Sequence, residues 1–234
     1  MKLYSEMEHR MVKDGGYRIF LIRHGETDWN KSFRYQGSSD VELSGAGREQ
    51  ARMLGIRLGT TVPARVVSSP LSRAYETARI IMEHNAEGVE IEKDPDLREI
   101  SFGIWEGHTP SEVKELDYDK LIRWRAAPFS VTPNGGETME ELTIRASRAA
   151  RGLTEPGMPG EAIFVVAHGG ILRALLAILM KFDDMNITWR MRMDNCSITA
   201  VDIWENRTSL YILNDSHHCR MPGDELAAAL SFSL

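Results

Sequence analysis

Cysteine is scarce in this chain of 234 residues, which contains only Cys196 and Cys219. Two cysteines cannot form the disulfide framework of a small secreted protein, so we expect free thiols and a cytoplasmic location. Long apolar runs are missing as well. Residues 1–16 lack the apolar core of a signal peptide, and the most apolar stretch, 171–180, is short and interrupted by Arg173. We therefore expect no association with a membrane.

A surplus of basic residues is also absent. The chain has 28 lysines and arginines against 34 aspartates and glutamates, a formal net charge of −6. Such a balance makes binding to nucleic acid or to an anionic lipid surface a poor hypothesis. With 42% hydrophobic and 26% charged residues, the composition is typical of a folded globular protein and excludes disordered and low-complexity classes.

Short apolar segments alternate with amphipathic ones along the chain. The expected strands cover residues 19–22, 64–67, 89–92, 162–167, 197–203 and 209–213, the last two forming a hairpin. Helices are expected over 44–58, 70–84, 111–127, 138–153 and from residue 170 onward; Ser44 is a plausible N-cap, Pro70 suits a first helical position, and Thr138 with Glu141 forms a capping box. This alternation predicts an α/β fold whose mostly parallel sheet is covered on both sides.

A histidine lies at the end of each of two predicted strands, where parallel α/β sheets bind ligands, and an arginine precedes the first histidine. Arg23-His24-Gly25 comes after strand 19–22. A histidine held there can have one ring nitrogen fixed by a backbone carbonyl and the other available as nucleophile or base, and the arginine fork suits phosphate or carboxylate. His168-Gly169-Gly170 follows strand 162–167 and precedes a helix whose first amides favour an anion. Taken alone, Arg23-His24-Gly25 is more often a structural turn without a role, because such a short motif recurs by chance. His168-Gly169-Gly170 alone is equally compatible with a structural strand–helix turn.

Two more side chains extend this set. Arg73 lies in a first helical turn, where the helix dipole disfavours a cation unless a bound anion neutralises both. Glu99 stands in the irregular segment 97–110 beside Ile100, Phe102 and Trp105, where burial would raise the pKa of its carboxyl into the range useful for a general acid. The alternatives are a solvated surface arginine and an exposed loop acid.

Together, two arginines, two histidines and a carboxylate favour an anionic ester processed through a phosphorylated histidine. The run His217-His218-Cys219 could ligate a metal, but the sequence supplies no further ligands at suitable spacing. We therefore expect neither a metal nor a cofactor.

Six segments resemble, in order, the motifs of the histidine phosphatase superfamily, the phosphoglycerate mutase-like group. They are 19–30 (IFLIRHGETDWN), 43–51 (LSGAGREQA), 68–78 (SSPLSRAYETA), 97–107 (LREISFGIWEG), 135–145 (GGETMEELTIR) and 167–170 (AHGG). The resemblance extends from about residue 17 to residue 215. It implies one three-layer α/β/α domain over residues 17–215, preceded by a loosely ordered extension (1–16) and followed by a tail (216–234).

The resemblance also implies roles for individual residues. His24 matches the phosphate acceptor, Glu99 the proton donor, and Arg23, Arg73 and His168 the phosphate pocket. The expected substrate contacts are Asn30, Gln36, Gly37 and Gly169.

The implied function is that of a metal-independent, histidine acid-type phosphatase acting on a small phosphorylated metabolite; a homodimer is compatible with the sequence. One alternative is a cofactor-dependent phosphoglycerate mutase, which is disfavoured in two ways. First, the mutases that this chain resembles have a longer insertion between the acid and the second histidine, whereas Glu99 and His168 are only 69 residues apart here. Second, those mutases have adjacent arginines, whereas Arg123 and Arg125 are separated by Trp124. A non-catalytic phospho-ligand binder is the other alternative, weakened because His24, Glu99 and His168 are all present.

Overall fold

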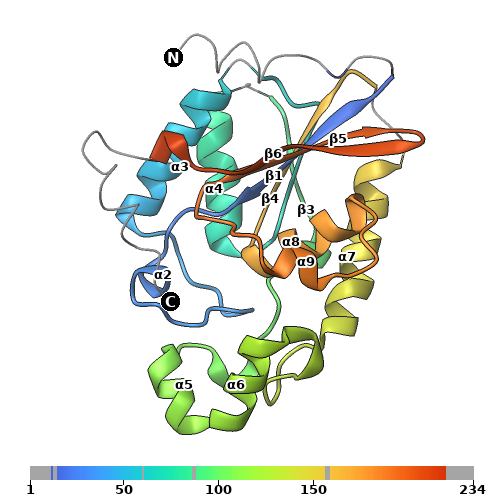
Figure 1. Cartoon of the computed structure of the whole chain (residues 1–234). Helices are drawn as coiled ribbons and strands as arrows, with labels where there is room; N and C mark the ends of the chain where they lie inside the picture. Colours follow the sequence, from blue (N-terminus) through green and yellow to red (C-terminus); the bar gives the residue numbers. More distant parts are fainter. Residues whose placement is uncertain (1–11, 13–14, 60, 86–87, 156–158, 220–234) are drawn as a thin grey trace.

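The structure, a computed structural model, describes residues 12, 15–59, 61–85, 88–155 and 159–219. One six-stranded sheet crosses the molecule, with the strand order β3-β2-β4-β1-β5-β6 (Figure 1). The strands are β1 (Tyr17–Arg23), β2 (Arg65–Ser68), β3 (Ile91–Lys93), β4 (Ala162–Ala167), β5 (Ile198–Trp204) and β6 (Arg207–Asp215). The first four are parallel, β5 is antiparallel to β1, and β5 and β6 form the expected hairpin.

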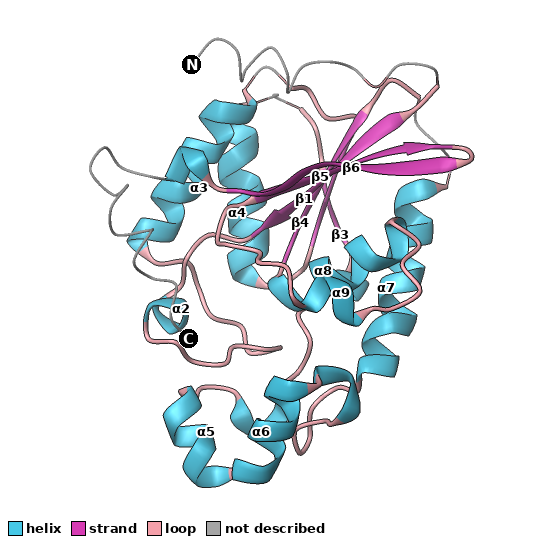
Figure 2. Ribbon diagram, in the orientation of Figure 1, coloured by secondary structure: helices cyan, strands magenta, loops and turns pink. Residues whose placement is uncertain are grey.

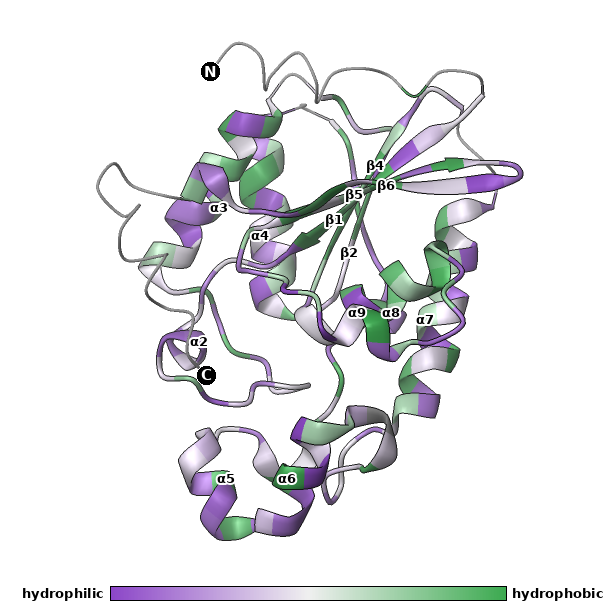
Figure 3. Cartoon of the chain, in the orientation of Figure 1, coloured by the Kyte–Doolittle hydropathy of each residue, from purple (hydrophilic) through white to green (hydrophobic). Residues whose placement is uncertain are grey.

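Alternating side chains of the central strands supply two hydrophobic cores. In β1, Phe20 packs toward helices α3 (Gly45–Leu58) and α4 (Ser72–Glu83), and its partner in β4 is Phe164. Leu21 packs toward α7 (Met139–Thr154) and α8 (Gly169–Leu179) on the opposite face. Figure 2 shows the two helix pairs on either side of the sheet, and Figure 3 shows how apolar the strands between them are. The predicted three-layer α/β/α sandwich with a mostly parallel sheet is confirmed.

Shorter elements complete the described chain, and some of them lie beyond the end of the sheet at which the parallel strands finish. They are α2 (Asp28–Lys31), α5 (Pro110–Leu116), α6 (Tyr118–Ala126), α9 (Asn186–Trp189) and the 3-10 turns η1 (Pro95–Leu97), η2 (Gly103–Trp105), η3 (Pro128–Ser130) and η4 (His217–Cys219). Helices α5 and α6 lie together beyond this end, away from the sheet (Figure 2). Within the described ranges, no helix has the length and apolar character needed to cross a membrane.

The capping residues predicted from the sequence are confirmed at two helices, and one predicted helix is divided. Ser44 caps α3, and Thr138 forms a capping box with Glu141 at α7, as predicted. The helix expected over 111–127 is instead two helices that meet at Asp117, whose carboxylate accepts a hydrogen bond from the indole of Trp105.

Other boundaries also differ. The helix expected from Pro70 begins at Ser72, because Leu71 has an extended backbone with a ψ of 137°. Asp40 accepts hydrogen bonds from the amide and the hydroxyl of Ser72. The strand expected at 89–92 is Ile91–Lys93, where its pairing with β2 begins. Most of the predicted extension 1–16, and the tail beyond residue 219, lie outside the described residues.

Candidate active site

The two predicted histidines meet where β1 and β4 end. These strands are parallel neighbours, so His24 and His168, the residues that follow them, lie side by side, with ring centroids 5.0 Å apart. The exposed fraction is 2% for His24 and 0% for His168. The sheet itself therefore brings together residues that are 144 positions apart in the chain.

The ring of His24 is held in one orientation. Its Nδ1 lies 2.7 Å from the carbonyl oxygen of Gly25 and donates to it, so the lone pair of the neutral ring is on Nε2. None of the described residues forms a hydrogen bond with Nε2. Burial, followed by the positive charges of Arg73 and Arg23, holds the pKa of His24 well below its usual range, although the Gly25 carbonyl opposes this shift. The imidazole is therefore neutral at pH 7.

His168 is neutral for similar reasons. Nε of Arg73 donates to its Nδ1 at 3.1 Å, so Nε2 carries the proton and donates to Oγ of Ser69 at 2.8 Å. Burial and then Arg73 lower the pKa of His168 well below its usual range. The remaining Arg73 nitrogens donate to the carbonyls of Ser39 (2.7 Å) and Gly37 (2.8 Å).

Arg73 and Arg23 lie close to both histidines, and a third guanidinium group, that of Arg173, lies near Arg23. Arg73 is completely buried, and burial lowers its pKa to about 10, which leaves it charged at neutral pH. Arg23 donates to the carbonyl of Met193 at 2.6 Å, while its buried Nε has no hydrogen-bond partner in the part of the chain that the structure describes. The third cation is Arg173 of α8, which donates to the carbonyl of Met191 at 2.8 Å.

Sequence reasoning treated Arg173 only as an interruption of an apolar segment. A Cβ atom added to Gly169 would lie 3.3 Å from Nη1 of Arg173 and 3.9 Å from Nε of Arg23, so both guanidinium groups approach the start of α8. Burial, followed by the charge of Arg23, lowers the pKa of Arg173 to about 10. The available signal was a single cation in an otherwise apolar, buried helix.

The Glu99 carboxylate lies at the N-terminus of α8. It accepts hydrogen bonds from the amides of Gly170 (3.0 Å), Ile171 (3.1 Å) and Ile100 (3.0 Å). A Cβ atom at Gly170 would be 2.6 Å from Oε1 of Glu99, so this approach requires glycine. Of the apolar neighbours expected for Glu99, Ile100 lies beside the carboxylate, since its Cγ2 would be 2.9 Å from the same added Cβ atom, and Trp105 packs into the core.

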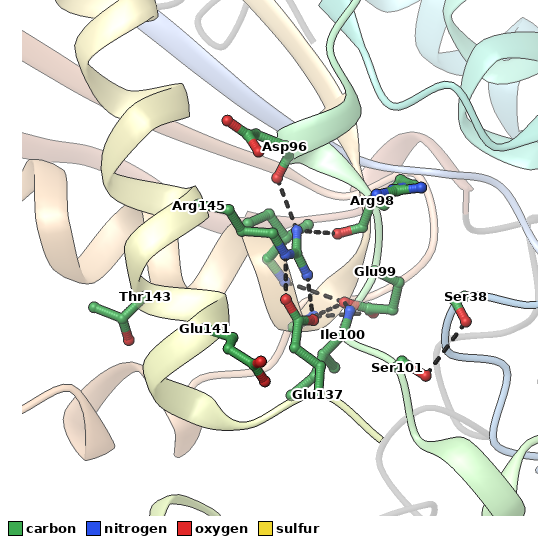
Figure 4. A network of polar contacts seen from close by, with 12 residues as sticks. Ser38, Asp96, Arg98, Glu99, Ile100, Ser101, Glu137, Glu141, Thr143 and Arg145 are labelled. Carbon is green, nitrogen blue, oxygen red and sulfur yellow. Dashed lines mark hydrogen bonds and ion pairs between the residues drawn. The ribbon is translucent and has the colours of Figure 1, made fainter. Parts of the chain in front are cut away.

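A buried arginine that sequence reasoning did not single out fixes the loop that carries Glu99. Arg145 of α7 forms an ion pair with Glu137 (2.5 Å) and donates to the backbone carbonyls of Asp96 (2.7 Å) and Arg98 (2.6 Å), as Figure 4 shows. The available signal was its position inside the matched segment 135–145. Arg145 thus attaches the segment before Glu99 to a core helix.

Glu106 joins a second loop to the site. Its carboxylate accepts hydrogen bonds from the amides of Ser38, Ser39 and Phe102, all at 3.0 Å, and from nearby hydroxyls. Burial acts to raise the pKa of Glu106, but these hydrogen bonds outweigh it and the pKa is lowered. Gly37 has a φ of +55°, and a Cβ there would overlap the Glu106 carboxylate. The structure therefore gives Gly37 a supporting contact, and its contact with substrate stays a prediction.

Two of the other predicted substrate residues, Asn30 and Gln36, are connected by hydrogen bonds to the loop that follows His24. Oδ1 of Asn30 accepts hydrogen bonds from Thr27 and Asn195, and Gln36 accepts one from the Thr27 hydroxyl. Asn195 also donates to the carbonyl of His24 at 3.0 Å. Asn30 and Arg23 line a cavity of about 410 Å³.

The structure also places the candidate metal ligands. In η4, Nε2 of His218 lies 2.9 Å from the carbonyl of Cys196, and its Nδ1 lies 2.9 Å from Arg57. Among the described residues, no three His, Cys, Asp or Glu side chains are grouped in a way that could hold a metal ion.

The chain is similar to known proteins over most of its length. The family model described as "Histidine phosphatase superfamily (branch 1)" matches residues 19–216. The chain is 31% identical over 201 residues to phosphoserine phosphatase 1 of Hydrogenobacter thermophilus, covering 86% of this chain and 93% of that protein. It is 34% identical over 195 residues to a protein of Enterobacter sp. named "Probable phosphoglycerate mutase GpmB", covering 81% and 86%. The structure of mycobacterial glucosyl-3-phosphoglycerate phosphatase with VO3 superposes with a TM-score of 0.75 at 34% identity, covering 84% of this chain and 98% of that one.

Proposed function

We infer, from the premise that this chain belongs to the histidine phosphatase superfamily (branch 1), that it hydrolyses phosphomonoesters through a phosphohistidine intermediate. The observation that carries the proposal is the state of His24. Its Nδ1 donates a hydrogen bond to the Gly25 carbonyl, and the lone pair of its Nε2 is available to attack phosphorus because the ring is neutral. A small phosphorylated metabolite is the proposed substrate.

The first step forms the bond between Nε2 of His24 and phosphorus and breaks the bond from phosphorus to the ester oxygen. Arg23, Arg73 and Arg173 supply the positive charge that such a transfer needs around the phosphoryl oxygens. Arginine suits this task because its fork binds two oxygens and keeps its proton. The lowered pKa keeps His24 neutral at a pH below the usual titration range of histidine, which supports the proposed acid-type activity.

Glu99 is the proposed acid and base. In its protonated form it gives its proton to the departing alkoxide, and the resulting carboxylate then removes a proton from the water that attacks phosphohistidine. Inorganic phosphate and free His24 are the products of this second step. The position of the carboxylate on the first amides of α8, directly after His168, supports this assignment.

The name of one relative favours a second candidate, a phosphoglycerate mutase. In that reaction a hydroxyl of the substrate, rather than water, accepts the phosphoryl group. Arg123 and Arg125 both lie in the last turn of α6, where residues two positions apart do not face the same way. Incubation with 3-phosphoglycerate and ³¹P NMR separates the reactions, since a phosphatase releases inorganic phosphate and a mutase forms 2-phosphoglycerate.

A rapid-quench experiment tests the proposal directly. Protein mixed with a ³²P-labelled phosphomonoester should carry acid-labile, alkali-stable label, and His24→Ala should carry none. Turnover without any labelled protein would contradict the phosphohistidine mechanism. Ligand binding with neither label nor turnover would indicate a non-catalytic binder.

A further inference from the structure

Helix α2 ends in a conformation that glycine usually provides. The amide of Phe33 donates to the carbonyl of Asn30 at 3.0 Å, and the amide of Arg34 donates to the carbonyl of Trp29 at 2.8 Å. These two bonds form a Schellman motif in which Phe33 occupies the left-handed position, with a φ of +54°. A bulky L-residue is unfavourable there, because its Cβ crowds the backbone.

Packing does not compensate for this backbone. The Phe33 side chain is 79% exposed, the largest fraction given for any large hydrophobic residue in the described ranges. The residue therefore combines an unfavourable backbone with an apolar ring in water. Residues with strained backbones cluster at active sites and ligand clamps, so the position of Phe33 relative to the site decides whether the strain is informative.

The ring borders the site. Phe33, Tyr35 and Pro110 line the same 410 Å³ cavity as Arg23 and Asn30, so the cavity adjoins the proposed phosphate pocket. The ring of Tyr35 is supported by Phe102, with centroids 5.2 Å apart. An alcohol attached to a phosphate at Arg23 would have these aromatic side chains as neighbours.

The two cations beside these apolar side chains, Arg34 and Arg125, already have polar partners. Arg125 of α6 is hydrogen-bonded to Tyr35. Nη1 of Arg34 already forms an ion pair with Glu112 (2.9 Å) and donates to the carbonyl of Gly107 (2.5 Å). The apolar side chains are therefore the part of the cavity wall that can bind the alcohol half of a phosphomonoester.

We propose that Phe33 is a specificity-determining residue, on which the alcohol half of the substrate stacks. The favoured phosphomonoesters then carry a flat apolar face, either an aryl ring or the C–H face of a sugar, and small polar alcohols are disfavoured. This inference rests on the proposed phosphatase function and adds the class of leaving group. Stacking on an aromatic side chain is strong enough to change selectivity by about fivefold.

The test compares two glycine substitutions at equivalent backbone positions. Phe33→Gly removes the ring, and Lys181→Gly is the matched control. Lys181 has a φ of +55° in a second Schellman motif, where its amide donates to the Ile178 carbonyl at 3.0 Å, at the end of α8. Both substitutions relieve the left-handed strain and should raise Tm by about 2 °C.

Only Phe33→Gly should change selectivity. The ratio of kcat/KM for benzyl phosphate to that for ethyl phosphate should fall about fivefold, through KM, and Phe33→Trp should restore it. These two esters leave as alkoxides of similar basicity, so the chemical step is matched. Glucose 6-phosphate is assayed in parallel to distinguish the two sources of a flat face. If kcat/KM relative to ethyl phosphate falls only for benzyl phosphate, the ring of Phe33 selects aryl groups. If it falls for both esters, the ring accepts the C–H face of a sugar as well as an aryl group.

An unchanged ratio in Phe33→Gly, or a fall in Tm that indicates a packing role, would overturn the inference while hydrolysis itself continued. Calorimetric binding of phenylphosphonate and methylphosphonate measures the same preference without turnover. If no ester is hydrolysed but phenylphosphonate binding still weakens about fivefold in Phe33→Gly, the proposed function fails and the stacking surface remains.

Discussion

The two halves of the site are held in different ways. The strand-end half, Arg23, His24 and His168, continues directly from β1 and β4, and the pairing of those strands places it. The loop half, Glu99 and Glu106, lies in irregular chain and depends on side-chain contacts with Arg145 and with the amides of other loops. Substitutions in the strand-end half should therefore remove chemistry while leaving the fold intact, whereas those in the loop half should affect both.

The largest effect is expected for His24→Ala in the strand-end half. Loss of the nucleophile should lower kcat by at least about 10³-fold, because the remaining groups can only bind and polarise the ester. Circular dichroism should show an intact fold, since the strands that place this residue are unchanged. The exposed His108→Ala is the control. Comparable activity in His24→Ala would remove this residue from the mechanism.

In the loop half, Arg145→Met should affect both stability and rate. Removing one partner of the buried pair leaves Glu137 uncompensated and should cost about 3–5 kcal/mol of unfolding free energy. Loss of its bonds to the loop should also misplace Glu99 and lower kcat by about 10²-fold.

Two further variants separate these effects. Arg148→Met on the same helix breaks an exposed pair with Asp96 and should cost about 1 kcal/mol or less. Adding Glu137→Leu to Arg145→Met should restore much of the stability but not kcat. Recovery of full activity in that double variant would show that Arg145 does not position Glu99.

Substitution of Glu99 itself should depend on the leaving group. Glu99→Gln should slow an alkyl phosphate by about 10²-fold, because an alkoxide needs its proton in the transition state. The effect on p-nitrophenyl phosphate should be much smaller while phosphorylation of His24 limits the rate, and phosphohistidine should accumulate on the variant. Equal, small effects on both esters would assign the acid to another residue.

The strand-end half should also determine how stability depends on pH. The pKa values of His24 and His168 are lowered on folding, so the unfolded chain binds more protons than the folded chain below the unfolded pKa of about 6.5. The contribution of the two neutral histidines to the free energy of unfolding is thus fully present above that pH. This contribution is lost as the pH falls, by up to about 1.4 kcal/mol per pH unit for each histidine. Denaturant unfolding between pH 8 and 5 measures this slope. An equally steep slope in His24→Gln/His168→Gln would assign it to other groups.

The smallest effect is expected from removing divalent metal ions. Three arginines can neutralise the phosphate, so dialysis against EDTA should leave kcat unchanged within error. A large loss that magnesium or zinc restores would mean that the strand-end half works with a metal.

The fold and half of the site could be predicted from local sequence. Buried parallel strands appear as short apolar runs, and Arg23, His24 and His168 follow such runs directly, so finding the strands also located these residues. The capping signals of α3 and α7 depend on residues three positions apart and were equally readable.

Contacts between distant loops have no such periodic signal. Two of the three amides that bind the Glu99 carboxylate are 71 and 72 residues further along the chain, and Arg145 of α7 bonds to the segment before Glu99. Nothing in the order of residues indicates that Arg173 approaches Arg23 or that Phe33 adopts a left-handed backbone. The sequence by itself determined the strand ends, because backbone pairing and burial act on neighbouring residues with a regular period. The tertiary structure decided the rest, because an ion pair or a shared carboxylate forms only after the chain has brought remote side chains together.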